Sequence, residues 1–256
     1  MDNMTGLFLL IVFVAFVLAF MDNTLGMGYG TLLTAILISL GFGPLEAVPA
    51  ILLSGTINGL FISSAHHLAG NIDFGWKDTP NLKIAFFLAG LSIVGVALSI
   101  LLALSLPQRV VKLYIGAVVI SMGVLTFFRD RMKTTFSWKK ISLVGLLAAF
   151  NKTMTGGGYG PLATAGQIMS GVNSKESVAI TALSESIAST LAIMGYFLGG
   201  VVLNSGLFAL LTLGALSSVP LSAYFVKNIE VKDHSKAIGI VTILLGAYTA
   251  FHLLFS

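Results

Sequence analysis

The sequence predicts an all-α polytopic membrane protein made of two inverted-topology repeats, whose short or broken helices meet near the midplane of the bilayer. Hydrophobic residues make up 56% of the 256 residues and charged residues only 9%, whereas a soluble domain carries about 25% charged residues. The apolar runs are long and unbroken, as membrane-spanning helices require. A polar, glycine-rich interruption of these runs occurs twice, 130 positions apart.

The two interruptions align without a gap. MDNTLGMGYG at 21–30 corresponds to NKTMTGGGYG at 151–160, and identical residues continue in this register as far as 57 and 187. We therefore divide the chain into a first repeat over 1–128, a basic loop over 129–140 and a second repeat over 141–256. Repeated interruptions of hydrophobic segments are the best sequence indication of a transporter's binding site.

Each half begins with two short apolar segments and continues with longer ones. The segments are 6–21, 30–41, 44–65, 81–106 and 110–128, followed by 141–152, 160–171, 174–199, 204–227 and 236–255. A complete crossing needs about 20 residues, so each short pair is either two crossings or a re-entrant hairpin of half-helices. The number of crossings is therefore between six and ten. No lysine or arginine precedes the first segment, so we expect a retained helix and not a cleaved signal peptide.

Basic residues indicate the orientation of the chain. They are concentrated in 129–140 and again in 227–236, and the positive-inside rule places both loops in the cytoplasm. An even number of crossings separates the loops, so both termini would lie outside and the two halves would have opposite topology. We expect a multi-pass protein of the cell (plasma) membrane with a cytoplasmic connection over 66–80. The oligomeric state is left open, a homodimer included.

Several functional classes lack support in the sequence. The chain has no cysteine, which excludes thiolate chemistry, disulfides and cysteine-based metal sites. No phosphate-binding loop, His-Glu-x-x-His element or Ser/His/Asp arrangement is present, so we expect no enzyme, no cofactor and no metal. His66 and His67 are adjacent, with no carboxylate three or four residues away. The basic residues lie between apolar runs, so we expect a lipid bilayer and not a nucleic acid as the partner.

The glycine breaks are the predicted substrate site. Glycine permits positive φ, and Pro161 suits the first turn of a helix that begins near Gly160. Unpaired N–H groups and the positive end of a helix dipole make an anion site there. The alternative is that the glycines only permit close helix packing. The predicted substrate-binding residues are Asn23, Gly28, Tyr29, Gly30, Asn58, Lys152, Thr153, Gly156, Gly157, Gly158, Tyr159, Gly160 and Ser184.

Charged residues inside the apolar segments are functional candidates by default. Lys152 would attract an anion, and Asp22, which occupies the same repeat position, would neutralise it when the site is empty. The alternative is that both side chains reach the interface. Glu185 lies about eleven residues into a long apolar segment, so it is our candidate for proton coupling. Tyr29 and Tyr159 would either donate a hydrogen bond to the substrate or pack between the halves.

Two motifs in the second half carry a family resemblance. With GGGYGP at 156–161 followed by GVNSKE at 171–176, the chain resembles the TauE/SafE sulfite-exporter family. The half-length repeat, the total length and the basic central loop also fit. The resemblance implies secondary transport of sulfur-containing anions such as sulfite, thiosulfate or organosulfonates, exported or imported. Because no ATP-binding motif is present, a proton gradient or the membrane potential would supply the energy. One alternative is a passive anion channel. Another is an intramembrane enzyme, but the sequence contains no recognisable nucleophile–base pair that would support it.

Overall fold

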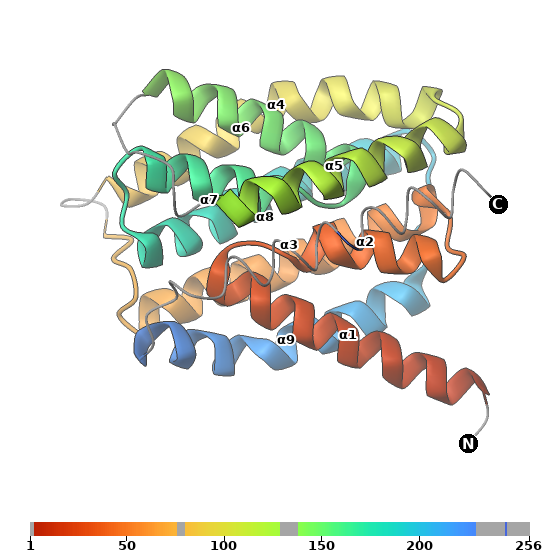
Figure 1. Ribbon diagram of the computed structural model, residues 1–256, viewed down its shortest axis with the longest axis horizontal. Helices are drawn as coiled ribbons and strands as arrows, with labels where there is room; N and C mark the ends of the chain where they lie inside the picture. The colour runs from red at the N-terminus through yellow and green to blue at the C-terminus, as the bar shows by residue number, and fades with distance from the viewer. Residues whose placement is uncertain (1–2, 76–79, 129–137, 229–243, 245–256) are drawn as a thin grey trace.

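The computed structural model describes residues 3–75, 80–128, 138–228 and 244, and the secondary structure of this part is helical throughout (Figure 1). The all-α prediction is therefore confirmed. Most of the basic loop, Lys232, Lys236 and nearly all of the segment 236–255 lie outside the described residues. The helices are α1 (Asn3–Leu25), α2 (Tyr29–Ser39), α3 (Pro44–Leu68), α4 (Asn81–Ser105), α5 (Gln108–Phe128), α6 (Trp138–Thr155), α7 (Tyr159–Met169), α8 (Ser174–Leu198) and α9 (Ser205–Asn228).

The long helices suit a bilayer in length and in surface. Within the described residues, five helices are long and apolar enough to cross a membrane: Thr5–Leu25, Pro44–Leu68, Asn81–Ser105, Lys175–Leu198 and Ser205–Asn228. A helix of 25 residues is about 37 Å long, which exceeds the roughly 30 Å of a hydrocarbon core. Large apolar side chains point outward, such as Ile93 at 60% and Leu101 at 68% exposure. The chain is therefore a multi-pass membrane protein, as the sequence predicts.

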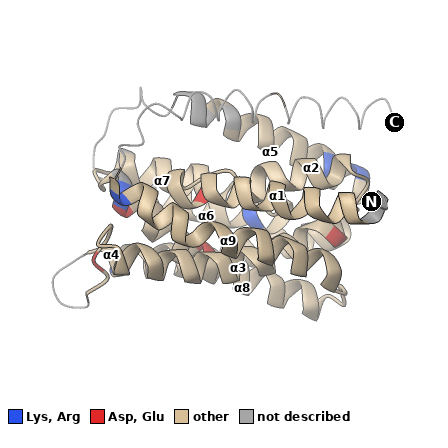
Figure 2. Cartoon of the chain, turned by 90° about the horizontal axis from the view of Figure 1, so that it is seen from below, with Lys and Arg blue, Asp and Glu red and all other residues tan. Residues whose placement is uncertain are grey.

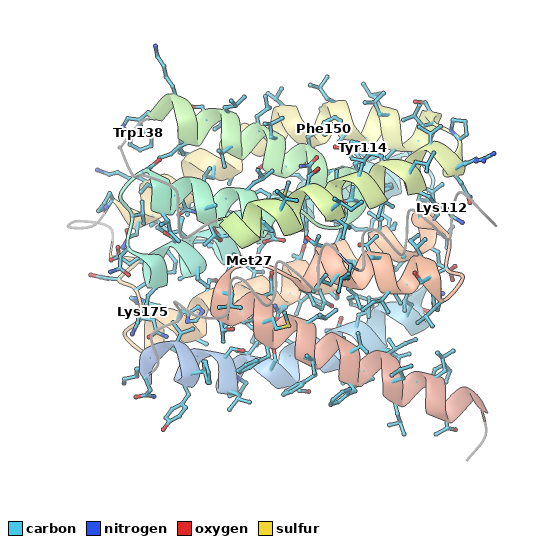
Figure 3. The ribbon with its side chains drawn as sticks, viewed as in Figure 1. Met27, Lys112, Tyr114, Trp138, Phe150 and Lys175 are labelled. Atoms are coloured by element: carbon cyan, nitrogen blue, oxygen red, sulfur yellow. The ribbon has the colours of Figure 1, made fainter. Side chains whose placement is uncertain are left out.

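Most charged residues lie at the two ends of the bundle, with few between them (Figure 2). Trp138 and Lys175 are at one end and Lys112 is at the other (Figure 3). The Lys175 ammonium donates to the backbone carbonyl of Lys227 at 3.2 Å, so the starts of α6 and α8 and the end of α9 share one end. The two basic loops of the sequence therefore leave the bundle on the same side. Which side faces the cytoplasm stays a prediction.

The helix boundaries repeat at the spacing of the sequence. α2 and α7 are 130 positions apart at both ends, and so are α3 and α8. Gly26 and Gly156, at matching positions in the breaks, have φ of 71° and 74°, a left-handed conformation that glycine adopts readily. The repeat read from the sequence is therefore a repeat of local structure.

Each short helix returns toward the end from which its partner came, as α1 and α2 show in Figure 1. Ile11 of α1 and Phe42, which follows α2, belong to one hydrophobic cluster. Ile141 of α6 and Val172, which follows α7, belong to another. Both pairs therefore form antiparallel hairpins, and each glycine break is buried inside the bundle. The first helix of the first pair, α1, has 23 residues and is longer than the segment 6–21 that the sequence predicts. The inverted topology of the halves in a bilayer stays a prediction.

The long helices α3 and α8 pack against each other in antiparallel fashion. Leu52, in the first half of α3, shares a cluster with Ala192 near the end of α8. Ile62, in the second half of α3, shares a cluster with Ala182 in the first half of α8. The midpoints of the two helices therefore lie side by side, next to both glycine breaks.

Candidate functional site

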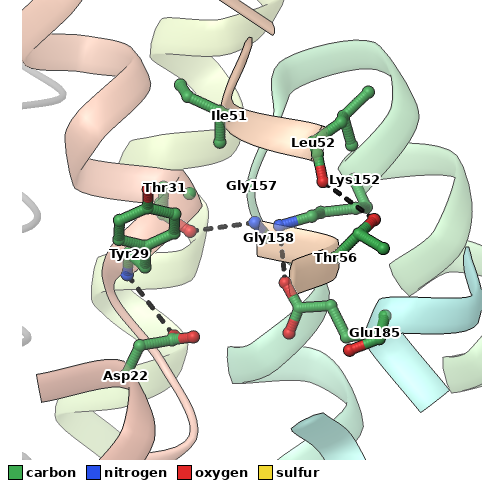
Figure 4. A network of polar contacts seen from close by, with 12 residues as sticks. Asp22, Tyr29, Thr31, Ile51, Leu52, Thr56, Lys152, Gly157, Gly158 and Glu185 are labelled. Atoms are coloured by element: carbon green, nitrogen blue, oxygen red, sulfur yellow. Dashed lines mark hydrogen bonds and ion pairs between the residues drawn. The ribbon is translucent and has the colours of Figure 1, made fainter. Parts of the chain in front are cut away.

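The two glycine breaks contact each other in the centre of the bundle. A methyl group on Gly30 would overlap the carbonyl oxygen of Gly156, and one on Gly160 would overlap that of Gly26. These two contacts are equivalent under the 130-residue repeat. The N–H of Gly158 donates to Thr31 Oγ1 at 2.8 Å (Figure 4). Glycine at these positions therefore allows two backbones to touch, which is the packing role that the sequence left open.

A small polar cavity lies beside the breaks, between α1, α3, α6 and α8. Its volume is about 20 Å³, which is room for about one water molecule. Glycines at 26, 55 and 59 contribute to its wall. The side chains with polar groups that line the cavity are Asp22, Asn23, Tyr29, Asn58, Lys152, Thr181 and Glu185.

An ion pair crosses this cavity. Lys152 Nζ lies 2.6 Å from Glu185 Oε1, and the side chains are 2% and 14% exposed (Figure 4). A buried charge requires such a partner because desolvation of an unpaired ion is costly. The alignment of the two repeats suggested Asp22 as the group that neutralises Lys152, but the ion-pair partner of Lys152 is Glu185. Asp22 Oδ1 instead accepts the N–H of Tyr29 at 3.3 Å.

A network of amide side chains borders the cavity on one side. Asn58 Nδ2 donates to Asn23 Oδ1 at 2.8 Å, and Asn23 Nδ2 donates to Ser218 Oγ at 3.0 Å. These bonds connect α1, α3 and α9. The backbone carbonyl of Asn23 is 2.9 Å from His66 Nε2. The amide groups that line the cavity are therefore held in place by the protein itself.

The two repeated tyrosines differ in their surroundings. Tyr29 is 1% exposed and lines the cavity, while its hydroxyl lies 2.8 Å from Ser54 Oγ. Tyr159 is fully buried in a hydrophobic cluster. Its hydroxyl is near Ser92 and Ser184 but makes no hydrogen bond of normal geometry with the described residues. The structure therefore places one tyrosine at the cavity and the other in the core.

The predicted site residues fall into two groups. Asn23, Tyr29, Asn58, Lys152 and Glu185 line the cavity. The remaining residues are buried nearby without lining it, namely Gly28, Gly30, Thr153, Gly156, Gly157, Gly158, Tyr159, Gly160 and Ser184. The N–H groups of Gly157 and Gly158 already donate to Thr155 Oγ1 and Thr31 Oγ1. A role of this second group in substrate binding stays a prediction.

The sequence analysis named Asp22 only as a group that neutralises Lys152, and it did not identify the other lining residues: Gly26, Gly55, Gly59, Ile62, Val178, Thr181 and Ala182. Gly55 occupies the repeat position of Glu185, and a Cβ added there would lie 3.7 Å from Lys152 Nζ. The sequence contained an indication of this space, because the repeat position of Glu185 in the first half is a glycine, Gly55, which leaves room for the side chains of the second half. No group of three His, Asp or Glu side chains within the described residues is suited to a metal ion.

Glu46 and Glu176, which occupy the same repeat position, form hydrogen bonds between neighbouring helices. Glu46, in the first turn of α3, accepts a hydrogen bond from Asn204 just before α9. Glu176, in the first turn of α8, accepts one at 3.4 Å from Asn81 at the start of α4. Asn173 caps α8 by accepting the N–H of Lys175 at 2.9 Å. Both glutamates therefore connect neighbouring helices and do not line the cavity beside the breaks.

Long apolar helices around a charged central cavity, with interrupted helices beside it, define a membrane protein of the transporter class. The family model described as Sulfite exporter TauE/SafE matches residues 11–249, and the chain belongs to this family. The chain is also similar to the probable membrane transporter protein YtnM of Bacillus subtilis (strain 168), with 25% identity over 249 residues, 93% of this chain and 80% of the relative. No solved structure matches the chain. The family resemblance seen in the sequence is confirmed.

Proposed function

We propose that the chain is a secondary transporter of small sulfur-containing anions, such as sulfite, thiosulfate or an organosulfonate, in the cell membrane. The observation that carries this proposal is the enclosed ammonium group of Lys152 at the cavity between the two halves. A cation held at that depth attracts an anion electrostatically and lowers the free energy of the anion inside the bundle. The description of the matching family, which concerns sulfite export, supports sulfur anions as the substrate class.

The charges around the cavity support coupling to protons. One ammonium and two carboxylates line it, Lys152 with Asp22 and Glu185, and these charges sum to −1 when all are ionised. An added anion would raise the negative charge further in a medium of low dielectric constant, which is unfavourable. Uptake of a proton by Glu185 would release Lys152 for the anion and remove one negative charge. A proton or potential gradient can therefore drive the cycle.

The size of the cavity supports a carrier mechanism. A volume of about 20 Å³ holds about one water molecule, whereas sulfite alone has four heavy atoms. The substrate can therefore bind only when the helices around Lys152 separate. Such a separation toward one face at a time is alternating access, which repeat-based transporters achieve by moving one half against the other. The direction of transport follows from the gradients in the cell.

A binding screen tests the proposal directly. Purified protein is exposed to sulfite, thiosulfate, sulfate and small sulfonates, and the thermal unfolding midpoint is recorded. A ligand at 100 times its Kd stabilises the folded state by about 2.7 kcal/mol. Hits are then tested for uptake into liposomes with and without a pH gradient. If no anion of the panel shifts the midpoint or enters the liposomes, the proposed substrate class is wrong.

The alternative is a passive anion channel lined by the same residues. The full-length protein in planar bilayers distinguishes the two functions. A carrier gives no resolvable unitary currents, because each conformational cycle moves few ions and takes microseconds or longer. Discrete anion currents that flow without a pH gradient would favour the channel and remove the need for Glu185 to bind a proton.

A further inference from the structure

Two buried side chains make equivalent hydrogen bonds in the two halves. His66 Nε2 lies 2.9 Å from the carbonyl oxygen of Asn23, and the Tyr196 hydroxyl donates to the carbonyl oxygen of Thr153 at 2.8 Å. Both partners are related by the 130-residue repeat, since 66 corresponds to 196 and 23 to 153. His66 and Tyr196 are 0% and 1% exposed. The residue types differ between the halves, yet the bond is kept.

The accepting carbonyls lie at the ends of the broken helices. Asn23 is in the last turn of α1 and Thr153 in the last turn of α6, where carbonyl groups have no partner within the helix. Each follows directly a charged residue of the cavity wall, Asp22 or Lys152. The two bonds therefore fix the ends of α1 and α6, and with them the charged side chains, against α3 and α8.

The two bonds lie on opposite sides of the cavity. His66 follows Gly55 by eleven residues on α3, and Tyr196 follows Glu185 by eleven residues on α8. Eleven residues are about three helical turns, so the side chains share a face of their helix at a distance of about 16 Å. The C-terminal ends of the antiparallel helices α3 and α8 lie at opposite ends of the bundle (Figure 1). His66 is in the last turn of α3 and Tyr196 is in the last turn of α8, so the two residues lie toward opposite ends.

The Tyr196 side has a route outward. A second cavity of about 30 Å³ is lined by Tyr196 and Met154. It shares Leu45, Leu104 and Gln108 with an open groove of about 610 Å³ next to residues 199–202. Tyr196 and its bond to Thr153 therefore stand between the charged cavity and the surface at that end.

At the other end, His66 is fixed by its second ring nitrogen. Asn71 Nδ2 donates to His66 Nδ1 at 3.0 Å and to the carbonyl oxygen of Ala223 at 3.0 Å. Because Asn71 is the donor, Nδ1 is the acceptor and the imidazole is neutral with its proton on Nε2. His66 therefore donates to Asn23, as Tyr196 donates to Thr153. Asn71 in turn ties this end to α9.

We propose that His66 and Tyr196 are the positioning residues that close the Lys152 cavity, His66 toward the end of the bundle with residues 69–75 and Tyr196 toward the end with residues 199–204. In the transport cycle one bond opens while the other stays closed. This inference rests on the proposed alternating access, and it adds which side chains hold each side shut. Neither residue needs to touch the substrate.

A cysteine reporter tests this role without any substrate. The chain has no cysteine, and a Cβ added at Gly55 meets only Lys152 Nζ, at 3.7 Å. Gly55→Cys is therefore placed in the full-length protein in sealed vesicles of each orientation and treated with a membrane-impermeant thiol reagent. We expect His66→Phe to accelerate labelling from one side only, and Tyr196→Phe from the opposite side only. Loss of one hydrogen bond predicts an increase of about five- to tenfold.

Matched variants separate this role from general loosening. Tyr114→Phe also removes a hydroxyl hydrogen bond, the half-buried one to Asn151, and should leave labelling unchanged. His66→Gln keeps an N–H donor and should restore the slow rate. Ala182→Cys, also on the cavity wall, replaces Gly55→Cys as reporter if the latter does not fold. Faster labelling from the same side in both variants, or no change in correctly folded protein, would overturn the proposal. A failed anion screen would reject the substrate class and leave this result standing.

Discussion

Lys152 and Glu185 form the buried ion pair of this protein's cavity, at 2.6 Å, and neither residue has a charged equivalent of the same sign in the first half. Their repeat partners are Asp22 and Gly55. The helix ends of α2 and α7, those of α3 and α8, and the contacts between the glycine breaks therefore repeat at this spacing, while the charges around the cavity do not. A single anion at Lys152 would consequently interact mainly with α6 and α8.

Lys152→Ala should weaken anion binding more than any substitution of a surface lysine. A hydrogen bond to a charged group contributes about 1.5–3 kcal/mol, which corresponds to roughly 10- to 100-fold in Kd. The matched control is Lys139→Ala, because Lys139 is exposed at the start of α6. Binding of the best anion from the screen is measured for both variants by scintillation proximity. Equal effects would remove Lys152 from the site.

The same substitution should also destabilise the protein, because it leaves Glu185 buried without a partner. Removal of one member of a buried ion pair costs about 3–5 kcal/mol. The double variant Lys152→Ala/Glu185→Ala should recover much of this stability in thermal unfolding, yet still fail to bind the anion. Recovery of binding in the double variant would show that the single variant had lost affinity only through misfolding.

Glu185→Gln should uncouple uptake from the pH gradient. Glutamine keeps the size of the side chain and an oxygen that accepts a hydrogen bond from Lys152, but its amide group does not take up or release a proton as a carboxyl group does. Anion binding should stay measurable, while uptake into liposomes should no longer respond to an imposed pH gradient. Glu176→Gln, at the joint with Asn81, is the control and should respond normally. An unchanged response in Glu185→Gln would refute its role in coupling.

Gly30→Ala should destabilise the fold, because its methyl group would overlap the carbonyl oxygen of Gly156. Overpacking of this kind costs about 1–3 kcal/mol and more where backbone is the obstacle. Gly90→Ala is the control, since an added Cβ there meets nothing within 4 Å and the exchange favours a helix by about 0.5–1 kcal/mol. Thermal unfolding in detergent should shift in opposite directions. A tolerated Gly30→Ala would mean that the breaks do not touch in solution.

The fold class and the repeat could be predicted because they depend on local rules. Membrane helices follow from long apolar runs, and the breaks follow from glycines whose conformation repeats, as at 26 and 156. The contact between Gly30 and Gly156 could not be read directly, because it depends on how two distant segments pack. The cavity was only partly predicted for the same reason.

The partner of Lys152 illustrates what a sequence comparison lacks. Repeat alignment pairs Lys152 with Asp22, but aligned positions are related by symmetry and need not touch. The contact is instead made with Glu185, which reaches Lys152 beside the space left by Gly55. His66 was considered only as a metal ligand, although a polar residue at the same repeat position as Tyr196 already indicated a shared role.

Tyr29→Phe and Tyr159→Phe should differ in stability. The Tyr29 hydroxyl lies 2.8 Å from Ser54 Oγ, so its removal should cost about 1 kcal/mol. The Tyr159 hydroxyl has no hydrogen-bond partner of normal geometry in the described part of the chain. Its removal should be neutral or slightly stabilising, because a buried unpaired hydroxyl is itself unfavourable. Unfolding midpoints of the two variants, compared with wild type, test this difference. A larger loss for Tyr159→Phe would indicate that its hydroxyl is bonded in solution.

The membrane orientation is tested by labelling the ends of the chain. The positive-inside rule places the basic residues of 129–140 in the cytoplasm, and the hairpin of α1 and α2 puts residues 40–43 at the same end of the bundle as the start of α1. Single cysteines at Asn3 and at Leu40, which is 44% exposed, should therefore react with an impermeant reagent outside intact cells. A cysteine at Lys139 should react only after the cells are opened. The inverted arrangement, with an odd number of crossings in each half, requires Asn3 and Lys139 to react from opposite sides, so labelling of both from the same side would contradict it. Labelling of Asn3 from the cytoplasm and of Lys139 from outside would instead reverse the orientation, and with it the faces to which His66 and Tyr196 close the cavity.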